Sequence, residues 1–172
     1  MTIFIDAKDQ VSSFLERNFF SCSSIRLFFA CMLLSLCVFL LQNVLELSID
    51  RLSGLFGFPS DVAGIQDIQV KVPWVSPLVF APVFENLVCL LLLRVASSVV
   101  PGRWKAPALV AAMAALLHMV AYMDVVYASI FVNFFVICAL IHNVEGSVRG
   151  FLASVLVHAL TNWLVLVQLR LA

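Results

Sequence analysis

Charged residues are scarce in this sequence. Only 12% of its 172 residues are Asp, Glu, Lys or Arg, whereas a soluble domain carries about 25%. Mean hydropathy is high, at +1.10, and runs of about twenty apolar residues recur along the chain. These features exclude an ordinary soluble domain and predict an integral membrane protein in contact with the lipid bilayer.

A basic surface and a cysteine framework are also missing. Ten Lys and Arg balance ten Asp and Glu, so the net charge is zero and there is no electrostatic footprint for nucleic acid. The five cysteines lack the paired spacing of zinc ligands or of a disulfide-stabilised domain; they are Cys22, Cys31, Cys37, Cys89 and Cys138. We therefore expect no nucleic-acid partner, no disulfide framework and no cysteine-based zinc site.

The start of the chain lacks the pattern of a cleavable signal peptide. Charged residues are scattered over residues 6–17, before any long apolar run. Apolar residues at helical spacing in this segment indicate a short amphipathic helix lying in the membrane interface, although a plain lead-in to the first span is an equal alternative. We therefore divide the chain into a lead-in (1–24) and a membrane domain (25–172).

Apolar segments are what the sequence has in abundance. We predict an all-α, polytopic transmembrane bundle whose five spans cover residues 25–45, 75–93, 106–121, 125–141 and 148–169. The third and fourth are shorter than the ~20 residues that cross a bilayer, so they must tilt or be buried in the bundle. Residues 46–72 are polar and form the only long connection, while residues 122–124 make a tight turn that pairs the third and fourth spans as an antiparallel hairpin.

The orientation follows from the basic residues near the span ends. Seven lie on one predicted side, namely Lys8, Arg17, Arg26, Arg94, Arg103, Lys105 and Arg149, and three lie on the other, namely Arg51, Lys71 and Arg170. Because cytoplasmic loops carry an excess of Lys and Arg, we expect a cytoplasmic N-terminus in a plasma or inner membrane, with the C-terminus on the opposite side.

Four polar residues occur inside the apolar segments: Glu85, His118, His158 and Asn162. Ionisable side chains are costly at membrane depth and usually pair, line a cavity or act there. His158 and Asn162 are four residues apart, so they share one helix face. Both can donate hydrogen bonds and could hold a developing oxyanion. An interhelical contact without catalytic function is the alternative.

The other two residues allow acid–base chemistry. Glu85 follows Pro82 in the second span, and a carboxylate there could be a general base or a purely structural group. His118, in the third span, could be a catalyst or simply a core residue. We interpret Asn133 in the fourth span as a helix–helix contact.

These three segments, in this order, resemble the motifs of the CPBP family of CAAX prenyl endopeptidases and bacteriocin-processing or immunity proteins, also called Abi. The family shows a proline-led Glu-Glu-x-x-x-Arg motif, then Phe-x-x-x-His, then His-x-x-x-Asn or Asp. Residues 81–86 look like the first motif with Glu85 as its leading Glu, residues 116–118 look like the end of the second, and His158 to Asn162 fits the third. The resemblance covers residues 77–163.

The chain departs from the family at three motif positions. Asn86 replaces the second Glu, Leu90 replaces the Arg, and Ala114 replaces the Phe. Arg94, one turn beyond Leu90, could supply part of the missing cation. The four family residues thought to act are all present.

The resemblance implies a glutamate-type intramembrane endopeptidase acting on a membrane-embedded or membrane-associated peptide or protein. Glu85, helped by His118, would activate water, and His158 with Asn162 would stabilise the oxyanion. We expect no cofactor, although one Glu with two His is also a ligand set for zinc. The alternatives are a non-catalytic immunity or scaffold protein with the same fold, favoured by Asn86 and Leu90, and a small transporter subunit in which Glu85 relays protons.

Overall fold

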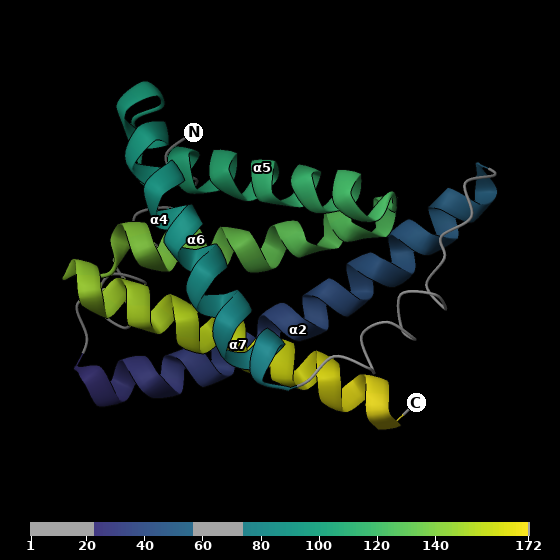
Figure 1. Ribbon diagram of the computed structural model, residues 1–172, viewed down its shortest axis with the longest axis horizontal. Coiled ribbons are helices and arrows are strands. Elements are labelled where there is room, and N and C mark those ends of the chain that lie inside the picture. Colours follow the sequence, from purple (N-terminus) through teal and green to yellow (C-terminus); the bar gives the residue numbers. More distant parts are fainter. Residues whose placement is uncertain (1–22, 57–73, 172) are drawn as a thin grey trace, which may run out of the picture.

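The computed structural model describes residues 23–56 and 74–171, and every element within them is a helix (Figure 1). The elements are α2 (Ser24–Leu55), the π-helix η2 (Ser76–Phe80), α4 (Ala81–Val99), α5 (Lys105–Tyr122), the 3-10 helix η3 (Val125–Ile130), α6 (Phe131–Asn143) and α7 (Ser147–Leu171). The predicted interfacial helix of the lead-in and residues 57–73 of the predicted connection lie outside the described residues.

Five helical segments of the described chain are long and apolar enough to cross a membrane. They are α2, the continuous segment Ser76–Val99 formed by η2 and α4, then α5, the segment Val125–Asn143 formed by η3 and α6, and α7. The predicted all-α class and the five spans are therefore confirmed, and the chain is an integral, multi-pass membrane protein.

The first span is longer than predicted. The sequence indicated an end near Leu45, but α2 continues to Leu55 and contains 32 residues. At 1.5 Å per residue it is about 48 Å long, well beyond the ~30 Å hydrocarbon core of a bilayer. The added segment is polar but contains no proline. Polarity ends an apolar run without ending a helix, which explains the error.

Two short turns set the antiparallel packing of the last three helices (Figure 1). Met123 adopts a left-handed conformation, with φ 54°, between α5 and η3. Gly146, with φ 88°, lies between α6 and α7. The predicted hairpin of the third and fourth spans is confirmed, since α5 packs along α6. In the same view, helix α4 crosses α6 and α7 at a steep angle. It is in contact with both helices.

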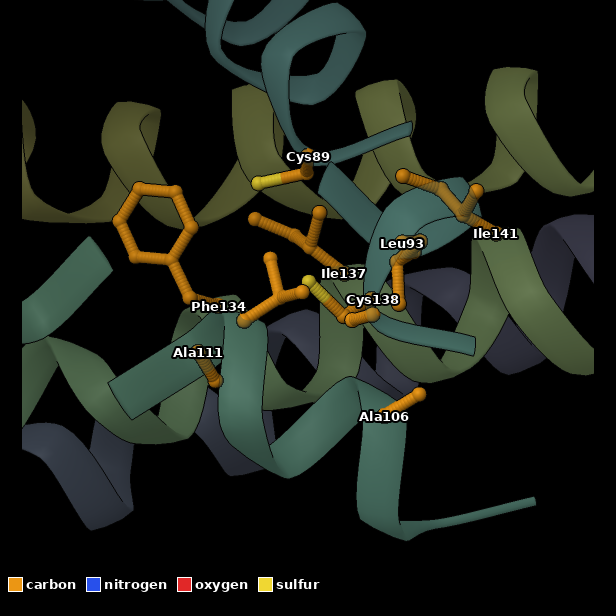
Figure 2. Close-up of a cluster of buried hydrophobic side chains, with 10 residues drawn as sticks. Cys89, Leu93, Ala106, Ala111, Phe134, Ile137, Cys138 and Ile141 are labelled. Atoms are coloured by element: carbon orange, nitrogen blue, oxygen red, sulfur yellow. The ribbon is translucent and has the colours of Figure 1, made fainter. Parts of the chain in front are cut away.

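Small and sulfur-containing side chains fill the core between α4, α5 and α6. Figure 2 shows Cys89 of α4 close to Ile137 and Cys138 of α6. Ala106 and Ala111 of α5 are fully buried in the same cluster. Such small residues allow helix backbones to approach closely, which matters in lipid because the hydrophobic effect does not drive helices together there.

A second cluster joins α2 to α7. Cys31 and Val157 are buried in it, and the thiol of Cys31 donates to the carbonyl oxygen of Ala153 at 3.8 Å. The hydroxyl of Ser35 donates to Cys31 O at 2.7 Å and reaches Val157 O at 3.4 Å. The first helix is thereby fixed against the helix that carries His158.

Gly150 of α7 lies tightly against the end of α6, so a larger residue there should cost stability. A Cβ atom there would lie 2.8 Å from the backbone oxygen of Leu140, and a backbone atom cannot move aside cheaply. We expect Gly150→Ala to destabilise the protein by about 1–3 kcal/mol, measured as a lower Tm in detergent.

The matched control is Gly54→Ala. A Cβ atom at Gly54 meets nothing within 4 Å, and alanine has the better helix propensity by up to about 1 kcal/mol. This variant should therefore be neutral or slightly stabilising. Equal Tm values for the two variants would contradict the packing of α6 against α7 described above.

Candidate active site

The four predicted residues line one cavity of ≈ 330 Å³. Glu85 comes from α4, His118 from α5, and His158 and Asn162 from α7. Side chains of α2, η2, η3 and α6 complete the lining. The volume is at the lower end of the 300–1,000 Å³ typical of ligand pockets. Three motifs that are distant in sequence therefore meet in space, while their catalytic roles stay predictions.

Glu85 and His158 form the shortest contact between ionisable groups at this site. Their atoms Oε2 and Nε2 are 3.7 Å apart, within the range of an ion pair if the imidazole is protonated. Only 4% of the His158 side chain is exposed, against 32% of the Glu85 side chain. The carboxylate therefore reaches the open part of the cavity, and the imidazole lies behind it.

A directional chain of hydrogen bonds fixes the imidazole of His158. Nδ1 lies 2.9 Å from Oδ1 of Asn86. Nδ2 of Asn86 donates to Oγ of Ser154 at 3.0 Å, and that hydroxyl donates to the carbonyl oxygen of Phe151 at 2.7 Å. Because an amide oxygen can only accept, Nδ1 carries the proton. In the neutral imidazole, Nε2 is therefore an acceptor that faces Glu85.

Asn86 has a larger role than the sequence indicated. It was interpreted as a weakened motif position, but it is completely buried and bonds α4 to α7 through two separate contacts. An orienting hydrogen bond to the second nitrogen of a histidine sets which nitrogen is available for chemistry. Asn86 thus provides a neutral hydrogen-bond acceptor for His158.

His118 is held in the same tautomeric form. Its Nδ1 lies 2.8 Å from the carbonyl oxygen of Ala114, one turn earlier in α5, so this nitrogen donates. The ring of Phe134 packs against both histidines, with centroid distances of 5.4 Å to His118 and 5.8 Å to His158. His118 is near enough for electrostatic interaction with both Glu85 and His158. The sequence interpretation paired Glu85 with His118, whereas the close ionisable partner of Glu85 is His158.

Asn162 holds the backbone of η2. Its Nδ2 donates to the carbonyl oxygen of Pro77 at 2.8 Å. In the π-helix, Ala81 N–H donates five residues back to Ser76 O, and the next donor in that pattern would be Pro82, which has no N–H. The amide of Asn162 thus satisfies a carbonyl that the proline leaves without a backbone donor. One hydrogen of the Asn162 amide nitrogen remains for a ligand.

Several lining residues were missed by the sequence analysis. The other polar or aromatic residues that line the cavity are Gln42, Asn43, Glu46, Tyr122, Tyr127, Ser129, Asn133, Phe134, Thr161 and Gln168. The sequence contained a signal for Gln42 and Glu46, because these two positions are four apart and share a helix face. It was overlooked because residues from 46 onward were assigned to a loop.

Two other interpretations change. Asn133 was interpreted as a helix–helix contact. It is buried, with 5% exposed, but it also lines the cavity, and its Oδ1 has no hydrogen-bond partner among the described residues. Arg94 is exposed and is not part of the lining, so it does not replace the cation of the first motif. Within residues 23–56 and 74–171, no three His, Cys, Asp or Glu side chains are grouped closely enough to hold a metal ion.

Comparison of the chain with protein-family models, with curated proteins and with solved structures finds no significant match. The resemblance to the CPBP family therefore depends on the three motifs alone.

The contacts of Asn86 predict its importance for stability. Asn86→Ala leaves His158 Nδ1 without its buried partner, which costs about 1–3 kcal/mol, and removes the bond to Ser154, whose hydroxyl keeps its bond to Phe151 O. We expect a marked fall in Tm and a mixture of His158 tautomers in ¹⁵N NMR spectra. Ser98→Ala is the control in the same helix, because Ser98 is exposed and bonds only to Val95 O. An unchanged Tm and a single tautomer in Asn86→Ala would contradict the described network.

Proposed function

We propose that this protein is a CPBP-like intramembrane endopeptidase that hydrolyses a peptide bond of a membrane-embedded or membrane-associated substrate. One observation carries the proposal. Glu85, His118, His158 and Asn162, which lie in four separate turns of three helices, line a single cavity, and Glu85 and His158 are within 3.7 Å of each other. A carboxylate beside an oriented imidazole is the arrangement that general base catalysis requires.

In the proposed reaction, a water molecule in the cavity gives a proton to Glu85 while its oxygen forms a bond to the substrate carbonyl carbon. His118 supports this step through its unprotonated Nε2, which can share the transferred proton. The C–N bond then breaks, and the proton passes to the leaving amine. Atoms and charges balance, because one water is consumed and the products are one acid and one amine.

The tautomers refine the role of His158. With Nδ1–H donated to Asn86, the neutral ring has no hydrogen at Nε2 and cannot donate to an oxyanion. It becomes a donor only when the proton that Glu85 has taken from the water moves on to its Nε2, from which this proton later passes to the leaving amine. We therefore propose that protonated His158, together with the free hydrogen of the Asn162 amide, stabilises the tetrahedral oxyanion. Loss of one such donor typically costs about 100-fold or more in rate.

The second candidate is a non-catalytic immunity or scaffold protein. Its support is the loss of the second Glu and the Arg of the first motif, at Asn86 and Leu90. A scaffold has no need of an exposed carboxylate beside an oriented imidazole, and unsatisfied or strained polar groups at membrane depth are costly. The retained pair therefore favours the enzyme.

Substitution at the site separates these functions. We expect Glu85→Gln to lower peptide cleavage by about 100-fold or more, with no comparable loss of protein in the membrane. His158→Ala should lower cleavage by at least as much, but it also breaks the buried bond to Asn86 and should lower Tm. The measurement is cleavage of a panel of membrane peptides by purified protein, beside its expression level. Glu145→Gln, at an exposed turn, is the matched control and should cleave normally. Full cleavage by Glu85→Gln would disprove the enzyme, whereas an unchanged biological effect of both variants would favour the scaffold.

The membrane orientation gives a further prediction. The seven-to-three split of basic residues supports a cytoplasmic N-terminus in a plasma or inner membrane. Five spans then put residue 172 on the other side. Reporter fusions at residues 1 and 172 should therefore report different compartments. The same compartment for both would mean that one of the five helical segments does not cross.

A further inference from the structure

The cavity extends well beyond the four motif residues. Its lining follows α7 from His158 to Leu169, about 16 Å along the helix axis at 1.5 Å per residue. This length matches about five residues of extended peptide at ~3.3 Å each. The part of the lining remote from His158 along α7 comes from α2, η3 and the last turns of α7. It combines polar side chains such as Glu46 and Gln168 with apolar ones such as Val165 and Leu169.

Glu46 is the charged group at this remote end. Its Oε1 accepts hydrogen bonds from Gln42 Nε2 at 2.9 Å and from Ser129 Oγ at 3.2 Å. These two donors hold the carboxylate in place but leave Oε2 without a partner among the described residues. No Lys or Arg of the described chain forms an ion pair with it or lines the cavity. Arg170, at the end of α7, stacks on Trp74 at 4.2 Å instead.

Two tyrosine rings line the same cavity as this carboxylate, and both contact the ring of His118, at 6.1 Å for Tyr122 and 6.5 Å for Tyr127. The two tyrosine rings are stacked with centroids 4.4 Å apart. Aromatic faces attract cations, most strongly where water is excluded. The described lining therefore offers Glu46 and two tyrosine rings to a ligand and presents no fixed positive charge, which favours a cationic group.

Asn133 is the second, independent observation. Its side chain is buried, with 5% exposed, it lines the cavity, and Oδ1 has no hydrogen-bond partner among the described residues. A buried unpaired amide costs free energy and is expected where a ligand completes the bonds. Asn133 lies one helical turn after Ser129, the donor to Glu46, and next to Phe134, which contacts both histidines. It thus lies between the two ends of the cavity.

We propose that Glu46, Tyr122 and Tyr127 form a subsite for a basic side chain, Lys or Arg, of the peptide substrate, and that Asn133 binds the peptide backbone between this subsite and Glu85. The inference rests on the proposed function, since it names the substrate class of the same cavity. A substrate would then carry its basic residue a few positions from the scissile bond.

Peptide binding tests the subsite without requiring turnover. The protein carries Glu85→Gln, so that bound peptide is not cleaved, and it is studied in uncharged maltoside detergent. The probes are fluorescent apolar peptides, each with one Arg at a successive position, and the same peptide with Gln in its place. We expect Arg at one or two neighbouring positions to tighten binding about tenfold, the range of hydrogen bonds to charged groups.

Two variants assign the preference to Glu46. Adding Glu46→Gln should abolish the Arg preference, and adding Glu46→Lys should reverse it toward a peptide with Glu at that position. Glu145→Gln, at an exposed turn, is the charge control and should keep the preference. No Arg preference at any position, or a preference that persists in Glu46→Gln, would overturn the inference. Its loss on adding phosphatidylcholine would assign the subsite to a lipid headgroup and overturn it as well.

Asn133→Ala distinguishes a role of Asn133 in peptide binding from a role in stability. Because Oδ1 makes no internal hydrogen bond, its removal should leave Tm unchanged or raise it, while binding of the Arg and Gln peptides weakens by a similar factor. A lower Tm with unchanged binding would contradict the role of Asn133.

The inference and the proposed function fail in different ways. If the protein without substitutions cleaves peptides but shows no charge preference, the inference is overturned and the endopeptidase function stands. A Glu46-dependent preference without cleavage of any peptide supports the subsite and contradicts the endopeptidase.

Discussion

The hydrogen bond between Asn86 and His158 is the contact on which the rest of the site depends. It joins α4 to α7 in the interior of the bundle, where both side chains are buried. It also sets the tautomer of His158, since the amide oxygen accepts a hydrogen bond from Nδ1–H and leaves the unprotonated Nε2 facing Glu85. The second bond of Asn86, to Ser154, keeps the amide from rotating and reversing that assignment. A structural contact between two helices thereby sets the protonation pattern of a neighbouring acid–base pair.

Prolines in the second span contribute to the same end. Pro82 removes a backbone donor from the first turn of α4, and the preceding residues form a π-helix. The carbonyl of Pro77 is then available to Asn162, which connects η2 to α7 about one turn from His158. Irregular backbone at membrane depth is tolerated where protein groups satisfy it or where it lines a cavity, and both conditions hold at η2.

The cavity has two ends of different character. At one end a carboxylate and two histidines with fixed tautomers support the proposed hydrolysis. At the other, Glu46 is stabilised by neutral donors. The two tyrosine rings that line the same cavity contact His118. The acidic, aromatic lining between helices is open to a substrate of complementary charge, and Asn133 between the ends provides an amide oxygen without a described partner.

Much of the fold was predictable because it depends on local composition. Apolar runs of sufficient length can only be satisfied as helices in lipid, where every backbone group must bond internally, so the five spans and the hairpin turn at Met123 followed directly. The end of α2 did not, because polar residues such as Glu46 end an apolar pattern while remaining compatible with a helix. The same residues were for that reason assigned to a loop and missed as cavity lining.

The sequence by itself determined which ionisable groups lie at membrane depth, since the positions of Glu85, His118 and His158 within apolar runs require no structure. The i to i+4 spacing also placed His158 and Asn162 on one helix face. Only the tertiary structure decided their partners. Contacts between α4, α7 and η2 join residues up to 85 positions apart, and their geometry depends on how whole helices cross. For that reason Asn86 emerged as the partner of His158, Asn162 as the support of η2, and Asn133 as a cavity residue.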